Sequence, residues 1–459
     1  MAPLALFSCL VFIAWLLVRD CKRRPSVSAA AWIPTLMVLI LGSRVPSSWF
    51  RQQRVVTGLG NESGGLLIDQ VFYLLMIFGS WIVATSRGVK WGKLFAANTA
   101  IMLFYVYFAM SFLWSNYPLD SFIRALKDFG VTVLVIPVIF SEKEPLEALR
   151  AVYVRCACVL LPLSMLFIRY YPAYGRVYAR GGETTYTGVS VSKNSFGQIL
   201  LISIVFLIWD HLETRLADGK RLWSGMRWDR LVLLLMGVWL LRLSHSQTSF
   251  VCLCIALALI LRSRRLASRT INNAVFFVAL SLPFLILLTQ QFSSIAAPIL
   301  EALGRDMTFT GRANIWQHIT STTVNPWIGC GFYNFWGGPG GRAIMEAMQT
   351  GIPNAHDGYL DIYLDGGAIG VALLFWLLFA SGKRIIRRLP GNGYQRLRFA
   401  FLIVAIVANL TESNFARLSA FWFTTVLVLL EFPFLKANEP FGHGPQESSN
   451  GSGVAEVAT

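Results

Sequence analysis

The sequence predicts an all-α polytopic membrane protein with about 12 to 13 transmembrane helices. Of the 459 residues, 55% are hydrophobic and only 14% are charged, which lies outside the usual balance of a soluble globular protein. Apolar runs of roughly 17 to 25 residues recur along most of the chain, and each can cross a hydrocarbon core of about 30 Å as a helix. The Lys and Arg residues that give the net charge of +16 lie between these runs. The charge therefore predicts contact with membrane lipids and argues against nucleic acid as a partner.

Candidate spans follow one another from the N-terminus to residue 434. They are expected near residues 3–18, 28–43, 66–85, 95–113, 128–140, 147–168, 196–210, 229–243, 248–261, 271–290, 358–380, 399–411 and 418–434. The first, fifth and eighth are the weakest, because they are short or merge with a neighbour. The first run has no preceding basic segment and is followed by a basic cluster that starts at Arg19, which favours a retained span over a cleavable signal peptide.

Alternate connections between the spans carry most of the 40 Lys and Arg residues, which predicts that these connections face the cytoplasm. The opposite set of connections is then expected on the outer face of the membrane. That outer set comprises residues 44–65, 114–127, 169–195, 244–247, 291–357 and 411–417. Every chemically unusual stretch of the sequence falls in this set.

The spans and connections divide the chain into four parts. Residues 1–290 are expected to form an N-terminal transmembrane bundle, 291–357 a large periplasmic loop, 358–434 the C-terminal transmembrane helices and 435–459 a disordered cytoplasmic tail. A loop of about 66 residues is too long to serve only as a connection, so we expect it to be functional.

The large loop contains a predicted helix start in the segment from Phe309 to His318. Thr310 is placed as an N-cap, so Arg312 would stand in the first turn beside free backbone N–H groups. A guanidinium at a helix N-terminus suits a diphosphate, because both groups favour oxyanions. A salt bridge from Arg312 to Asp306 or Glu301 is the structural alternative.

A turn-rich aromatic segment follows at residues 325–341, with six glycines among its residues. It lacks the Gly-Lys-Ser/Thr of a phosphate-binding P-loop, so nucleotide binding is not expected. A loop lying at the lipid interface is the alternative. The large loop then closes with His356 and Asp357. A neutral imidazole can take a proton from an attacking hydroxyl, and Asp357 could orient the ring. A histidine that merely lies at the membrane interface is the alternative.

Further basic and polar residues stand at span entrances on the outer face. These are Arg124 and Lys127, Arg169, Arg176 and Arg180, and Lys193 with Asn194. They are either solvated loop charges or contacts for an anionic lipid-linked substrate. Residues 244–248, Ser-His-Ser-Gln-Thr, form a polar segment that is consistent with a tight turn. The outer loops lack an Asp-x-Asp pair, and the seven cysteines lack metal-site spacing, so no metal or cofactor is expected.

In order along the chain, these motifs resemble the O-antigen ligase and polymerase family, which includes bacterial exopolysaccharide polymerases. The matching elements are Trp114-Ser115 with Pro118, Lys193-Asn194 with Gly197, Ser244 to Thr248, Gly311-Arg312 with Trp316, Pro326 with Gly329 and Gly331, and His356 with Gly358, Leu360 and Gly366. The sequence departs from the commonest family pattern at Ser192, where His is frequent, at Asp357, where Asn is frequent, and at Gln247, where Arg is frequent.

The resemblance implies a helical glycosyltransferase of the C type that inverts the anomeric carbon without a metal. Its donor would be a glycan on undecaprenyl diphosphate, and its acceptor either another glycan or the lipid A core. Carried over residue by residue, Arg312 would hold the donor diphosphate and His356 would assist the acceptor hydroxyl. A chain-length regulator is a possible partner.

Two classes of function remain open from the sequence. The first is the transfer of lipid-linked glycan. Within this class, a glycan polymerase is slightly favoured over a ligase, because the chain is similar overall to exopolysaccharide production proteins. The second class is a transporter or flippase for polysaccharide or lipid-linked oligosaccharide. Transporters usually show paired repeats and charges near the middle of the membrane. Neither is evident in this sequence, and the polar clusters gather in the outer loops instead.

Overall fold

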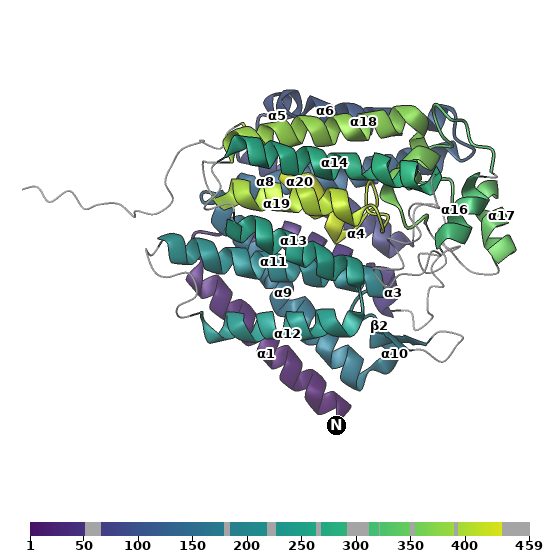
Figure 1. Cartoon of the computed structure of the whole chain (residues 1–459). Helices are drawn as coiled ribbons and strands as arrows, with labels where there is room; N and C mark the ends of the chain where they lie inside the picture. Colours follow the sequence, from purple (N-terminus) through teal and green to yellow (C-terminus); the bar gives the residue numbers. More distant parts are fainter. Residues whose placement is uncertain are drawn as a thin grey trace, which may run out of the picture.

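The computed structural model confirms an all-α protein whose helices run back and forth along a common direction (Figure 1). The structure describes residues 1–50, 66–178, 184–217, 226–262, 268–291, 312–320, 322–348, 354–389 and 393–433. Thr310, Asp306, Glu301, Arg180 and the expected tail at 435–459 lie outside the described residues, so the expectations that concern them stay predictions.

The first half of the chain forms helices joined by short connections, with one small β-hairpin. The elements are α1 (Ala2–Arg23), a 3-10 turn (Ala29–Ala31), α2 (Trp32–Gly42), α3 (Pro46–Phe50), α4 (Leu67–Ser86), α5 (Trp91–Ala97), α6 (Thr99–Met110), a 3-10 turn (Ser111–Leu113), α7 (Pro118–Phe129), a π-turn (Gly130–Leu134), α8 (Ile136–Phe140), α9 (Pro145–Tyr170), α10 (Pro172–Gly175), β1 (Arg176–Tyr178) and β2 (Thr184–Tyr186). The antiparallel hairpin pairs Arg176 with Tyr186 and was not predicted.

The second half completes the bundle and contributes the parts of the large loop that the structure describes. The elements are α11 (Lys193–Ala217), α12 (Trp228–Ser244), α13 (Gln247–Arg262), α14 (Arg269–Gln291), α16 (Arg312–Thr320), α17 (Pro339–Met348), α18 (Gly358–Arg388), α19 (Gly393–Ala408) and α20 (Ala420–Leu429). Helix α16 begins at Arg312, as the sequence predicts.

Several of these helices are long and apolar enough to cross a membrane. Five qualify by length and composition, and a sixth span is formed if the bent pair at Trp91–Ala97 and Thr99–Leu113, which meet at 94°, is counted as one. Four shorter apolar helices of 10–17 residues accompany them within the described residues. The chain is therefore a multi-pass membrane protein, and a total of 12 to 13 spans stays a prediction.

The connections segregate to the two ends of the bundle (Figure 1). Helices α3, α10, α16 and α17 and the hairpin lie together at one end, at the right of the picture. All of them belong to the segments that the sequence assigns to the outer face. We call this end the loop end, and the opposite end, where α1 finishes and α12 begins, the basic end.

Burial distinguishes central from peripheral helices. The most apolar window of α11 is 89% buried and that of α9 is 78% buried, whereas α1 and α4 are only 11% and 22% buried. Helices α9 and α11 therefore form the centre of the bundle, and α1 and α4 present most of their apolar surface outward, as expected for contact with lipid.

Candidate functional site

Helix α18 is broken near the loop end, at Gly367. This residue has φ 60° and ψ −161°, a conformation that essentially only glycine adopts. A break in a membrane-spanning helix leaves backbone groups that need new partners, because lipid supplies none. Those partners come from residues 326–331 of the large loop.

Four backbone hydrogen bonds join this loop segment to the break. The amides of Cys330 and Gly331 donate to the carbonyls of Leu364 and Asp365, at 3.0 and 2.9 Å. In the opposite sense, the amides of Ala368 and Ile369 donate to the carbonyls of Pro326 and Trp327, at 2.8 and 3.1 Å. We call residues 326–331 the clasp, because they hold the two halves of α18 in place.

The clasp explains the glycines of this segment. A Cβ on Gly367 would lie 2.2 Å from the carbonyl carbon of Trp327, and one on Gly329 would lie 2.5 Å from that of Asp365. Backbone approaches this close exclude side chains. The segment predicted as a turn-rich loop therefore makes a close backbone contact with α18. This contact explains its glycines without phosphate binding or a position at the lipid interface.

The Trp-Ser motif at 114–115 fixes the clasp to α6 and α7. The indole of Trp114 donates to the carbonyl of Ile328 at 2.9 Å, and the amide of Asn334 donates to the hydroxyl of Ser115 and, at 2.9 Å, to that of Ser121. Arg124 adds two hydrogen bonds, to the carbonyl of Tyr333 at 2.8 Å and to the amide oxygen of Asn334 at 3.0 Å.

His356 stands two residues before α18, with a left-handed backbone at φ 53°. Its backbone amide donates to the side-chain oxygen of Asn354 at 3.0 Å. The neighbouring Ala355 is fully buried, and its amide donates to the carboxylate of Asp361 at 3.2 Å. The imidazole is thereby carried on a backbone that is fixed from both sides.

Helix α16 is tied to the same backbone. The indole of Trp316 donates to the carbonyl of Ala355 at 3.0 Å. Trp316 follows Arg312 by four residues, so the two start on the same side of α16, one turn apart. The structure thus brings the helix that begins at Arg312 to the residue before His356. The side chain of Arg312 itself lies outside the described residues.

The carboxylate that faces His356 is that of Glu412, in the connection between α19 and α20. The imidazole Nδ1 lies 3.8 Å from the Glu412 carboxylate oxygen, and that same oxygen accepts a hydrogen bond of 2.9 Å from the side chain of Asn194. The His356 side chain is 29% exposed and that of Glu412 is 9% exposed. His356, Glu412 and Asn194 therefore form one group, drawn from α11 and from the segments before α18 and α20.

Asp357, which the sequence suggested as the group that orients His356, caps α18 in the structure. Its carboxylate caps α18 by accepting from the amides of Tyr359 and Leu360, at 2.9 and 3.1 Å. This is the usual role of Asp at an N-cap. The carboxylate predicted to orient His356 is thus engaged in the helix cap, and Glu412 occupies the position beside the imidazole Nδ1. A substrate contact of Asp357 stays a prediction.

Arg417 forms a buried ionic centre beneath this group. It contacts the carboxylates of Asp365 at 2.6 Å and Asp361 at 3.6 Å, and its guanidinium lies 4.2 Å from the centre of the Tyr333 ring. Burial alone would lower the pKa of Arg417, but the two carboxylates outweigh it and hold this pKa above its ordinary value. Arg417 is therefore permanently charged and couples the start of α18 to the large loop.

The remaining candidates lie at the same end but outside this group. The Arg176 guanidinium donates to the carbonyl of Ile168 at 2.9 Å and lies 5.7 Å from the ring centre of Tyr186, so it stabilises the hairpin. Lys193 is exposed at the first residue of α11. Ser244 to Thr248 form a tight turn with His245 left-handed at φ 51°, and Thr248 bonds Thr411 at 2.8 Å, beside Glu412.

The described residues contain no group of three His, Cys, Asp or Glu side chains that could hold a metal ion. Burial raises the pKa of the Cys330 thiol in the clasp above its ordinary value, which disfavours the thiolate form. Glu412 and Arg417 escaped the sequence reasoning although they stand in a predicted outer segment. The sequence did contain a signal for Arg417. Asp361 and Asp365 stand four residues apart inside an apolar run, and acids in such a run need a buried cation as a partner.

Comparison with known proteins identifies the family that the sequence is similar to. A family model described as O-antigen ligase matches residues 231–375, from the first turn of α12 to beyond the break in α18. The exopolysaccharide production protein ExoQ of Rhizobium meliloti (strain 1021) is 24% identical over 336 residues, which cover 69% of this chain and 72% of the relative. The chain is thus similar to the O-antigen ligase and polymerase family, and these matches support a polytopic membrane enzyme of the ligase or polymerase type.

Proposed function

We propose that this protein transfers or polymerises undecaprenyl-diphosphate-linked glycan on the periplasmic face of the bacterial inner membrane, as a metal-independent, inverting glycosyltransferase. The observation that carries the proposal is the group at the loop end. An imidazole, a carboxylate and an amide from three distant segments meet there, beside the helix that begins at Arg312. This set can bind an anionic leaving group and remove a proton.

In the proposed reaction, the acceptor hydroxyl oxygen attacks the anomeric carbon of the donor sugar from the face opposite the diphosphate. The new carbon–oxygen bond forms as the bond from the anomeric carbon to the phosphate oxygen breaks, which inverts the carbon. His356 takes the hydroxyl proton, and Glu412 stabilises the resulting imidazolium. Arg312 neutralises the charge that grows on the departing undecaprenyl diphosphate, and a guanidinium does so without a change of protonation.

Asn194 positions Glu412 through its 2.9 Å hydrogen bond, and Lys193 precedes it as an exposed cation at the start of α11. Lys193 is proposed to contact the phosphates of the donor. Arg124 is proposed to act indirectly, by fixing the loop just after the clasp, since its guanidinium donates to Tyr333 and Asn334. Arg176 and Asp357, which stabilise the hairpin and cap α18, are proposed only as secondary substrate contacts.

Polymerase is favoured over ligase, because the curated relative is described as an exopolysaccharide production protein. In a polymerase the acceptor is a second lipid-linked glycan, and in a ligase it is the lipid A core. A chain-length regulator would be a partner of the polymerase form. The matching family model is described as O-antigen ligase, so transfer to the lipid A core is the alternative that the experiment below distinguishes.

The test is complementation of a deletion strain with His356→Asn and Arg312→Ala at equal membrane abundance. Asn tolerates the left-handed backbone of residue 356 but cannot act as a base, so it removes the chemistry and spares the fold. A general base contributes about 10²- to 10⁴-fold and a group that stabilises developing charge about 10²- to 10³-fold, so each variant is expected to lose at least 99% of its glycan product. His245→Asn is the matched control, because it makes the same change at a left-handed histidine in a turn.

The lipid-linked pool decides between the two acceptors when it is analysed by gel and mass spectrometry. Accumulated single lipid-linked repeats support the polymerase, whereas long lipid-linked chains beside bare lipid A core support the ligase. If His356→Asn and Arg312→Ala both restore normal glycan, the assignment of the site is wrong.

A further inference from the structure

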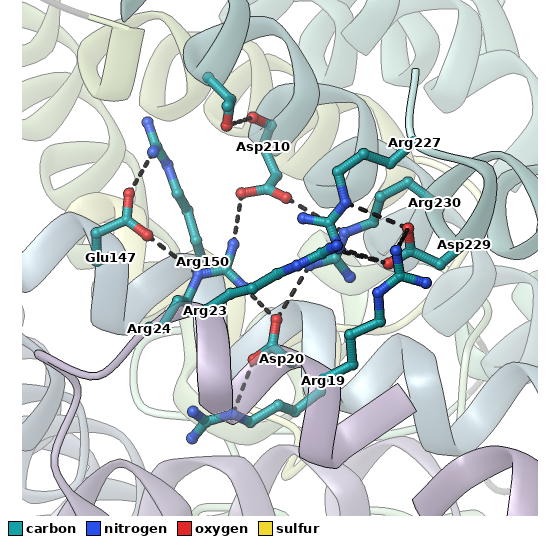
Figure 2. Close-up of polar contacts among 12 residues, drawn as sticks. Arg19, Asp20, Arg23, Arg24, Glu147, Arg150, Asp210, Arg227, Asp229 and Arg230 are labelled. Atoms are coloured by element: carbon teal, nitrogen blue, oxygen red, sulfur yellow. Dashed lines mark hydrogen bonds and ion pairs between the residues drawn. The ribbon is translucent and has the colours of Figure 1, made fainter. Parts of the chain in front are cut away.

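The basic end of the bundle contains an ion network that the proposed reaction does not use (Figure 2). Its inner part centres on Asp20 of α1, which accepts from Arg155 of α9 at 3.1 Å and from Arg230 of α12 at 3.0 Å. Arg24 bonds Asp20 as well and reaches Asp210 of α11 at 2.8 Å. All of these side chains are at most 9% exposed. The inner part therefore ties four helices together.

The outer part of the network has a different charge balance. Three arginines gather around the single carboxylate of Asp229, with Arg227 at 2.6 Å, Arg23 at 3.5 Å and Arg19 at 3.9 Å. Arg227 donates a hydrogen bond to each oxygen of the Asp229 carboxylate. One negative charge thus faces three positive charges, and this outer group keeps an excess of two.

The outer guanidiniums are accessible. The side chains of Arg19, Arg23 and Arg227 are 25%, 35% and 38% exposed, whereas that of Asp229 is 4% exposed. Among the residues that the structure describes, Arg19 makes no hydrogen bond. Its five N–H donors are therefore available to a ligand.

The surroundings of Arg19 belong to the lipid-facing surface. Its guanidinium lies 4.9 Å from the ring centre of Trp15 and 5.1 Å from that of Trp228, and these two rings stack on each other at 5.1 Å. Trp15 is 39% exposed and Trp228 is 52% exposed. Tryptophan at the end of an apolar helix marks the depth of the lipid head groups.

We propose that Arg19, Arg23 and Arg227 bind the phosphate of an anionic phospholipid, with Trp15 and Trp228 packing against its glycerol and upper acyl chain. The excess positive charge selects an anionic head group, and the planar forks of three arginines match phosphate oxygens. The tryptophan pair supplies apolar contact that free phosphate cannot use. The site lies at the opposite end of the bundle from His356 and does not depend on the proposed reaction.

The experiment measures lipid retained by the purified full-length protein. The protein is exchanged into nanodiscs of phosphatidylcholine with a small fraction of phosphatidylglycerol, re-extracted in mild detergent and analysed by native mass spectrometry. Each arginine near a head group is expected to contribute about fivefold in affinity. Arg19→Gln/Arg227→Gln is therefore expected to retain phosphatidylglycerol about 25-fold less well than wild type, and Arg23→Gln alone about fivefold less well.

Lys93→Gln/Arg387→Gln is the matched control, because it removes two exposed charges from the same end of the bundle but outside the network. It is expected to retain phosphatidylglycerol as wild type does. Equal loss in both double variants would mean diffuse surface attraction and overturn the proposal. Displacement of the lipid by millimolar inorganic phosphate would also overturn it, since the ligand would then be a free anion. Arg23→Gln keeps the test decisive if the double variant fails to fold.

Discussion

The two ends of the bundle both gather charged side chains, but they differ in backbone conformation. All four non-glycine residues with positive φ among the described residues lie at the loop end: His245, Tyr333, His356 and Ala416. The basic end holds most of its charges on regular helices: Asp20, Arg155, Asp210 and Arg230 lie within helical turns, and Arg24 and Arg227 flank helix ends. Strained backbone is concentrated where the candidate site lies, as expected when a fold positions groups for a reaction.

The charges also have different partners at the two ends. At the basic end, Asp20 is within 3.1 Å of arginine nitrogens from two other helices. At the loop end, the imidazole of His356 stands 3.8 Å from Glu412, and its Nδ1 has no hydrogen-bond partner among the described residues. The His356 side chain is also 29% exposed, whereas those of the inner network are at most 9% exposed. We infer that the inner network at the basic end serves stability, whereas the accessible imidazole at the loop end is available for chemistry.

The largest effect is expected from Asp20→Asn at the basic end. The change removes the shared charge from three buried arginines, and breaking such a buried pair costs about 3 to 5 kcal/mol in the free energy of unfolding. Thermal unfolding in detergent measures this loss, with Glu144→Gln, an exposed acid at the same end, as the control. Glycan transfer per folded molecule should remain near the wild-type rate. A strong loss of that rate without loss of stability would break the comparison between the ends.

A smaller effect is expected from Gly367→Ala at the loop end. The new Cβ would lie 2.2 Å from the Trp327 carbonyl carbon, and φ 60° with ψ −161° is strained for alanine. We expect a loss of about 3 kcal/mol in the free energy of unfolding, together with loss of transfer, because the clasp must move. Gly337→Ala is the matched control, since its Cβ would meet nothing within 4 Å. Equal unfolding midpoints for the two variants would show that the clasp is not required.

The sequence predicted the features that depend on local pattern. Apolar runs located the spans, and the placement of basic residues predicted which connections would share an end. The break at Gly367 could not be predicted, because Gly366 and Gly367 interrupt neither the length nor the hydrophobicity of their run. The clasp that stabilises the break pairs residues 326–331 with 364–369 through backbone atoms. The glycines that it requires indicate a close backbone approach but do not say which segment lies opposite.

The site was predicted in part for the same reason. His356 and the helix start at Arg312 could be predicted from residue type and motif, but the identity of the carboxylate beside His356 could not. Asp357 is its neighbour in sequence, yet a carboxylate at that position satisfies the free amides of α18. Glu412 reaches His356 only because α19 returns to the loop end, and contacts across 56 positions are set by packing rather than by local sequence.

The smallest effect is expected from Glu412→Gln. This variant sharpens the comparison between the two ends, because it tests whether the Glu412 charge assists the reaction at the loop end. Gln can still accept the hydrogen bond from Asn194 but cannot stabilise an imidazolium, so we expect kcat to fall about tenfold with little change in KM. Glu412→Asp should restore part of the rate, since it returns the charge. Glu346→Gln, an exposed acid on α17, serves as the control. If Glu412→Gln lowers membrane abundance but leaves kcat unchanged, Glu412 is structural, and the loop end would then resemble the basic end.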